Sequence, residues 1–100
     1  HQLEMTIASR STADADRSYV AMLNAGGISL VAKKFGEEAV EAIIAALSQD
    51  KAALTGEAAD VMFHLLVLLN ACGVTLADVE AELTRREGTS GIAEKAARAN

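Results

Sequence analysis

The run Val61-Met62-Phe63-His64-Leu65-Leu66-Val67-Leu68-Leu69 gives the strongest indication of the fold. Apolar residues surround the axis of any helix built from it, and a helix that is apolar on every side is buried among other helices. The run is also far shorter than the ~20 residues needed to cross a bilayer, and His64 interrupts it. We therefore expect the central helix of a bundle, and no membrane as a partner.

The composition of the whole chain agrees with a helical protein. Of its 100 residues 51% are hydrophobic, only 3% are aromatic and none is proline. Such a chain lacks the residues that interrupt helical hydrogen bonding, and it favours closely packed helix faces. We predict an all-α fold: one domain over residues 1–100, a bundle of about four to five helices.

Helix-capping residues and glycines divide the chain into elements. Serine and aspartate are typical N-caps, and glycine commonly ends a helix. The first predicted elements are a short amphipathic helix around Leu3 and Ile7, a loop over Ser9 to Arg17, and a helix over Tyr19 to Asn24 capped by Ser18 and ended by Gly26 and Gly27. A long helix over Ser29 to Leu47 follows, and then the most apolar helix between Asp50 and Gly73. The last predicted elements are a helix from Thr75 to Arg86, a break at Gly88 to Gly91, and a helix from Ile92.

Charge and cysteine content limit the possible partners and compartment. The net charge is −5, the wrong sign for a protein that follows a phosphate backbone, so we do not expect nucleic acid as a partner. Cys72 is the single cysteine and lies next to the apolar run. We interpret it as a buried thiol in a reducing, cytoplasmic protein, and no secretory signal is recognisable.

The long helix separates into two faces when its residues are placed 100° apart. The carboxylates Glu37, Glu38 and Glu41 share one arc. The opposite arc is predicted to face the core, and its members are Val31, Phe35, Ala39, Val40, Ala42, Ile43, Ala46 and Leu47. On the most apolar helix, Glu57, Asp60 and His64 form a second polar stripe. Acids on a helix that is otherwise apolar are not explained as an ordinary solvated face.

Two acidic stripes brought together would repel each other unless something compensates their charge. A raised pKa with protonation of one carboxyl group is one solution, and a divalent cation is the other. Oxygen ligands without cysteine favour Mg²⁺ or Mn²⁺ over zinc. Glu38 with Glu41 and Glu57 with Asp60 are each three residues apart, so we predict that these four acids are the metal ligands.

The neighbouring charged residues suggest further roles. Glu37, together with Glu38, is the predicted catalytic pair, in which Glu37 orients or deprotonates a water held near the metal. Lys33 and Lys34 lie one turn earlier on the same arc and are predicted to hold phosphate oxygens.

Other interpretations of these residues remain open. A run with the pattern E-E-x-x-E is often a solvated face, and each lysine could simply form an i,i+4 pair. His64 is more readily explained as a hydrogen-bonded interior histidine than as a ligand. A carboxylate-bridged di-iron bundle would need Glu-x-x-His on two helices, which the spacing does not provide. A purely structural dimerisation module would leave the buried acids unexplained.

The motifs resemble those of a known family. Lys34-Phe35-Gly36-Glu37-Glu38-Ala39-Val40-Glu41 is followed by Glu57-Ala58-Ala59-Asp60 and His64, with Ser18-Tyr19 before them and Ser90-Gly91 to Arg98 after them. Together these segments resemble the phosphoribosyl-ATP pyrophosphatase family of histidine biosynthesis, within the all-α nucleotide pyrophosphohydrolase superfamily that includes the MazG-type enzymes. The resemblance covers nearly the whole chain.

This resemblance implies an activity and an assembly. The activity is Mg²⁺-dependent hydrolysis of phosphoribosyl-ATP to phosphoribosyl-AMP and pyrophosphate, and Lys95 and Arg98 are further candidates for phosphate contacts. The expected assembly is a homodimer, or a higher homo-oligomer, that completes the helical core, with active sites near the subunit interface. A general nucleoside triphosphate pyrophosphohydrolase and a non-catalytic helical dimerisation module are the alternatives.

Overall fold

The computed structural model describes residues 2–10 and 18–87, which contain five α-helices and no strand. The helices are α1 (Gln2–Arg10), α2 (Tyr19–Ala25), α3 (Gly27–Ser48), α4 (Lys51–Ala71) and α5 (Leu76–Glu87). The predicted all-α fold is confirmed. The predicted loop over Ser9 to Arg17 is wrong at its start, because Ser9 and Arg10 belong to α1, and residues 11–17 lie outside the described residues. The predicted break at Gly88 to Gly91 and the helix from Ile92 lie outside the described residues.

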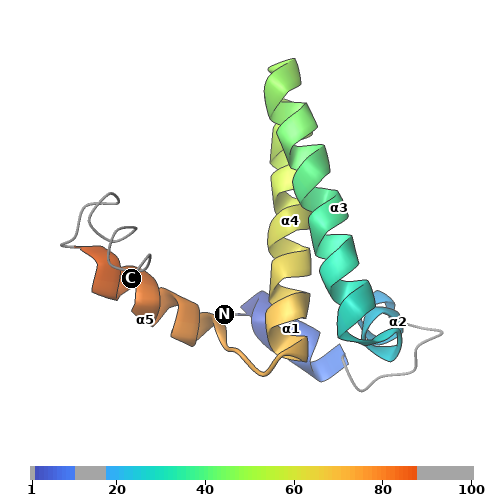
Figure 1. Cartoon of the computed structure of the whole chain (residues 1–100), viewed down its shortest axis with the longest axis vertical. Helices are drawn as coiled ribbons and strands as arrows, with labels where there is room; N and C mark the ends of the chain where they lie inside the picture. The colour runs from blue at the N-terminus through green and yellow to red at the C-terminus, as the bar shows by residue number, and fades with distance from the viewer. Residues whose placement is uncertain (1, 11–17, 88–100) are drawn as a thin grey trace.

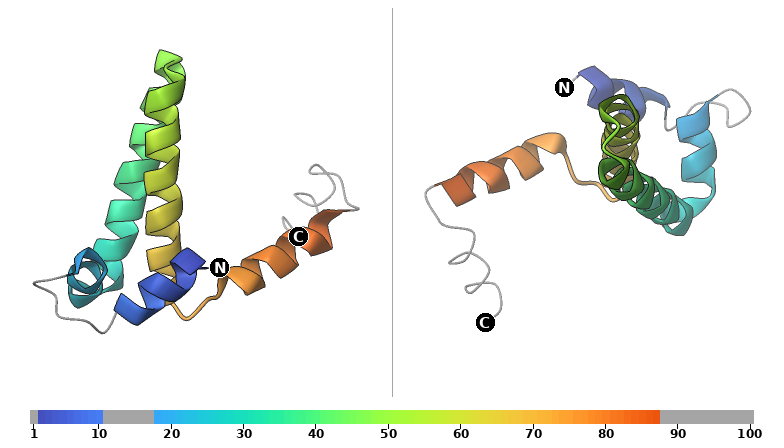
Figure 2. Two further views of the ribbon diagram at one scale, coloured as in Figure 1. Left: turned by 180° about the vertical axis from the view of Figure 1, so that it is seen from behind. Right: turned by 90° about the horizontal axis from the view of Figure 1, so that it is seen from above.

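A long antiparallel hairpin of α3 and α4 dominates the molecule (Figure 1). The short helices α1 and α2 pack across one end of the hairpin, against α4 and α3 respectively. Helix α5 leaves this same end and extends away from the hairpin in every view (Figures 1 and 2). The opposite end, at the turn between α3 and α4, has no helix of the described chain beside it.

The starts of α2 and α4 follow from the predicted caps, whereas α3 begins at Gly27, two residues before the predicted Ser29. The side chain of Ser18 accepts a hydrogen bond from the Ala21 amide at 3.2 Å, and Asp50 accepts one from the Ala53 amide at 3.1 Å. These contacts satisfy amides in the first turns of α2 and α4. Gly27 and Gly73 adopt the left-handed backbone conformation, with φ of 84° and 74°, and glycine enters this region without a steric penalty.

The hydrophobic core lies at the end of the hairpin where α1 and α2 pack. It consists of buried residues from four helices, namely Ile7, Val20, Leu23, Val31, Leu66 and Val67. The second half of α4 therefore occupies the central position that its apolar run predicts. The first half of α4 contacts α3 and is otherwise mostly exposed.

The predicted core face of α3 is partly wrong for the single chain. Val31 is buried, but Val40 is exposed, and Ile43 and Leu47 are 59% and 79% exposed. Phe35, Ala39 and Ala42 of the predicted arc are half-buried, and Ala45, outside the arc, is buried. The part of the arc made by Val40, Ile43 and Leu47 is therefore left exposed.

The prediction that Cys72 is a buried thiol is also wrong, because its side chain is exposed. It caps the C-terminus of α4, where the chain leaves the helix toward Gly73 and passes beyond the core.

Within the described chain, α4 is long and apolar enough to cross a membrane by length and composition alone. However, it carries Glu57 and Asp60 near its middle, and charged side chains are costly at that depth in a bilayer.

Candidate metal centre

The short turn between α3 and α4 determines which acids face each other. The two helices run antiparallel from Gln49 and Asp50, so positions equally far from the turn lie side by side. Glu41 precedes Gln49 by eight residues, and Glu57 follows Asp50 by seven. The hairpin geometry therefore brings the two acidic stripes together, as the spacing predicts.

Three carboxylates meet at this position. Glu38, Glu41 and Glu57 each offer an oxygen, and these oxygens lie within 4.8 Å of one another. Glu38 and Glu57 are half-buried, whereas Glu41 is exposed. Among the described residues, no lysine or arginine forms an ion pair with any of the three. The group is thus an acidic cluster without a compensating cation.

Glu57 is the most perturbed member of this cluster. Its Oε2 atom is buried and has no hydrogen-bond partner, which is unfavourable for a carboxylate oxygen. Burial raises the pKa of Glu57 above its ordinary value, and the neighbouring charge of Glu41 raises it further, with smaller contributions from Asp60 and Glu38. Both observations indicate that the oxygen lacks a positively charged partner.

Asp60 lies at the edge of the cluster. Its side chain is exposed and does not belong to the group of three oxygens, although it is close enough to contribute to the raised pKa of Glu57. A hollow of about 300 Å³ opens on the other side of the cluster, toward the turn of the hairpin. Its lining includes Glu41, Ser48 and Glu57.

Glu37 lies outside the cluster and is paired with both predicted phosphate ligands. Its carboxylate is 3.3 Å from the Nζ atom of Lys34 and 4.0 Å from that of Lys33. The hydrogen bond and charge of Glu37 raise the pKa of Lys34, and Tyr19 contributes to the same effect. The predicted base and the predicted phosphate-binding lysines therefore form one ion-paired group, in which the lysines lie one turn of α3 before the cluster and Glu37 directly precedes Glu38.

His64 is an interior residue, in agreement with the simpler interpretation of the sequence. It is buried, its Nδ1 atom is 2.7 Å from the Asp60 carbonyl oxygen, and its Nε2 atom is 2.8 Å from the Tyr19 hydroxyl. Both ring nitrogens thus have protein partners. The spacing of acids does not reveal Tyr19, because 45 residues separate it from His64 and only the tertiary structure joins them.

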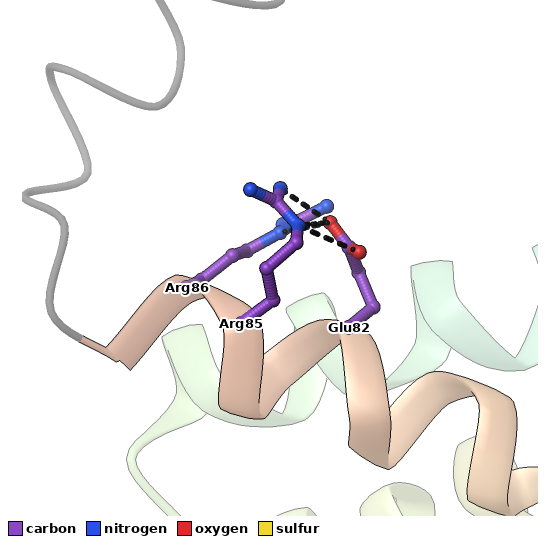
Figure 3. A network of polar contacts seen from close by, with 3 residues as sticks. All are labelled: Glu82, Arg85 and Arg86. Carbon is purple, nitrogen blue, oxygen red and sulfur yellow. Dashed lines mark hydrogen bonds and ion pairs between the residues drawn. The ribbon is translucent and has the colours of Figure 1, made fainter.

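A second polar group, on α5, is separate from this centre. Glu82 accepts hydrogen bonds from Arg85 and Arg86, as Figure 3 shows. These bonds lower the pKa of Glu82 to about 2. In this helix-surface network the negative charge of Glu82 is balanced by the arginines, whereas the acidic cluster has no such partner among the described residues. Lys95 and Arg98, the remaining predicted phosphate contacts, lie outside the described residues.

Comparison with known proteins assigns the chain to a family. The family model for phosphoribosyl-ATP pyrophosphohydrolase matches residues 1–87. A protein of Rhizorhabdus wittichii called phosphoribosyl-ATP pyrophosphatase is 63% identical over 97% of this chain and 92% of its own length. Proteins of the same name from Novosphingobium aromaticivorans and Dinoroseobacter shibae are 60% and 62% identical, over 99% and 97% of this chain and 92% and 95% of their own lengths. With its acidic cluster between two antiparallel helices, the chain belongs to the phosphoribosyl-ATP pyrophosphohydrolase family.

Proposed function

We propose that this chain hydrolyses phosphoribosyl-ATP to phosphoribosyl-AMP and pyrophosphate in histidine biosynthesis, using Mg²⁺ held between α3 and α4. Family membership, with relatives of the same name about 60% identical over nearly the full chain, supports the activity. The observation that carries the metal proposal is the meeting of three uncompensated carboxylates within 4.8 Å.

The residues fit a hard divalent cation. Carboxylate oxygens are the ligands that Mg²⁺ prefers, and the buried, unpartnered Oε2 atom of Glu57 would gain a ligand bond. Glu38, Glu41 and Glu57 would hold the ion, and Asp60 at the edge of the cluster would complete the set after a side-chain rotation. When bound, Mg²⁺ neutralises phosphate charge and lowers the pKa of a coordinated water.

The Lys33, Lys34 and Glu37 group has a role that follows from its ion pairs. These pairs are largely exposed, and exposed pairs contribute at most about 1 kcal/mol. Phosphate oxygens of the substrate can therefore replace the Glu37 carboxylate as partners of Lys33 and Lys34. Glu37 then becomes free to accept a proton from the attacking water. Lys95 and Arg98 stay as predicted further phosphate contacts.

We also propose that residues 1–100 form one domain whose core is completed by a second copy of the chain. The exposed apolar side chains of the hairpin support this proposal, since a patch of this kind is typical of an interaction surface. They are Val40, Ile43, Ile44 and Leu47 on α3, with Leu54 and Met62 on α4. The single free cysteine is consistent with a cytoplasmic protein.

The activity is tested by pyrophosphate release with phosphoribosyl-ATP, ATP and deoxynucleoside triphosphates, each with Mg²⁺ and with EDTA. We expect rapid, Mg²⁺-dependent release from phosphoribosyl-ATP alone. Equal turnover of all substrates would favour a general nucleotide pyrophosphohydrolase, and no turnover of any would favour a dimerisation module.

Variants of the cluster test the metal site in the same assay. Glu41→Gln removes one charge from the cluster, whereas the matched variant Glu80→Gln removes an exposed charge from α5. Activity should be lost in the first variant and retained in the second. Full activity of Glu41→Gln would contradict a metal centre at this position.

A further inference from the structure

Tyr19 is an exposed aromatic residue held in place by several contacts. Its hydroxyl lies 2.8 Å from the Nε2 atom of His64. Its ring stacks on Phe63 with the centroids 6.1 Å apart, and it meets the edge of the His64 ring at 5.7 Å. Ser18 caps the helix at the position just before it. The orientation of the ring is therefore fixed by both α2 and α4.

The direction of the hydrogen bonds fixes the role of the Tyr19 hydroxyl. The Asp60 carbonyl can only accept, so the Nδ1 atom of His64 carries the proton and donates it. In the neutral imidazole the Nε2 atom is then an acceptor, and the Tyr19 hydroxyl donates to it. The hydroxyl hydrogen is thus used within the protein, so the part of Tyr19 that is open to a ligand is its ring.

Tyr19 is 44% exposed although its ring is fixed. Tyr19 also lies beside the proposed site, because it contacts His64, which follows Asp60 by one turn of α4. Tyr19 is also close enough to Lys34 on α3 to raise the pKa of that lysine, although Glu37 contributes more. A fixed, exposed aromatic side chain close to Lys34 and to the α4 turn that carries Asp60 is an unusual use of surface for a purely structural residue.

The geometry points to Tyr19 as a stacking surface for the adenine base of the nucleotide substrate. This inference deepens the proposed function and rests on it. The substrate has anionic phosphates and a flat purine; the lysines and the metal centre suit the phosphates, and the aromatic ring suits the purine. Base stacking on aromatic side chains is a common source of nucleotide affinity, and it uses the ring face rather than the hydroxyl.

Tyrosine fluorescence tests the inference directly, because the chain has one tyrosine and no tryptophan. The ligands are AMP and ribose 5-phosphate, which share the sugar and the phosphate but differ in the base. With Mg²⁺ present, AMP should quench the emission in a saturable way and ribose 5-phosphate should not. Equal responses to both, or no response to AMP, would overturn the inference. Free N-acetyltyrosinamide corrects for absorption of light by adenine.

The same titration separates this inference from the proposed function, because AMP contains no phosphoanhydride and requires no catalysis. Quenching by AMP in a chain that does not hydrolyse phosphoribosyl-ATP would contradict only the proposed activity. Hydrolysis without any quenching would contradict only the role of Tyr19. Emission that responds to protein concentration but not to AMP would place the ring in a subunit interface and also overturn the inference.

Variants separate the ring from the hydroxyl. Tyr19→Leu removes the aromatic face and should raise the KM for phosphoribosyl-ATP about tenfold with little change in kcat. Tyr19→Phe keeps the ring and should change the KM by less than about twofold. Met22→Ala is the control, since Met22 is 46% exposed on the same helix. A Tyr19→Phe variant that is folded by circular dichroism but as impaired as Tyr19→Leu would refute stacking.

Discussion

Replacement of Ile43 by alanine tests the proposed dimer at one of the exposed apolar side chains of α3. The substitution removes three carbon atoms from a side chain that is 59% exposed in the single chain. Each buried methylene contributes about 0.8 kcal/mol, so covering the exposed part of these carbons stabilises the interface by about 1.4 kcal/mol per subunit. In a twofold-symmetric dimer the substitution occurs twice, which gives about 3 kcal/mol, or roughly a hundredfold weaker association.

Sedimentation velocity over a concentration series measures this change. The wild-type chain should be dimeric at micromolar concentration, and Ile43→Ala should shift the monomer–dimer midpoint upward by about a hundredfold. Met5→Ala is the matched control, because Met5 is 70% exposed but lies on α1 rather than on α3. Its midpoint should not move. If the active site lies near the interface, the activity of Ile43→Ala should recover as its concentration rises.

Two results would refute the reasoning. A wild-type chain that stays monomeric at micromolar concentration would exclude the dimer at working concentrations. A dimer whose midpoint is the same in Ile43→Ala and in wild type would place the interface elsewhere. Circular dichroism of each variant should match wild type, since the replaced atoms of Ile43 are largely outside the core of the single chain.

The remaining predictions concern charge. Because burial and Glu41 raise the pKa of Glu57, the folded apo protein binds more protons than the unfolded chain just above pH 4.5. Its stability should therefore fall as the pH rises through the raised pKa, and Mg²⁺ should bind more tightly over the same range. Glu57→Gln should abolish both effects in melting curves recorded with and without EDTA. The pKa of Glu82 is lowered to about 2, so its ionised carboxylate should stabilise α5 fully above pH 4.5 and lose this contribution as the pH falls to 2. The melting temperatures of wild type and Glu82→Gln should therefore converge in acid, and a constant difference would contradict this. Asp50→Ala removes the cap of α4 and should cost about 1 kcal/mol, seen as a melting temperature lower by several degrees, whereas Gln49→Ala should have a smaller effect.

Local features of the sequence were sufficient to predict the helices. Ser18 and Asp50 cap their helices as expected, because N-capping depends on contacts within about three residues of the chain. The pairing of Glu38 and Glu41 with Glu57 was also predictable, since a two-residue turn forces α3 and α4 to run antiparallel. The meeting of the acidic stripes therefore does not depend on how α1, α2 and α5 pack.

Side-chain burial on α3 was not predictable in this way. Helical periodicity identifies an apolar arc but not its partner, and Val40, Ile43 and Leu47 were predicted to face the core. In the structure Ala42 and Ala45 are half-buried and buried, whereas Val40, Ile43 and Leu47 are exposed. Cys72 was misplaced for a related reason, because an apolar neighbourhood in the sequence does not show where the core ends.

The amino-acid sequence by itself determined the helical class, the caps of α2 and α4, the local pairs of Glu37 with Lys33 and Lys34, and the meeting of Glu38 and Glu41 with Glu57, because periodicity, capping and a short turn act over a few residues. Only the tertiary structure determined that Tyr19 reaches His64 across 45 residues. Contacts at that separation depend on how α2 packs against the hairpin, and packing is set by the shapes of all the helices together.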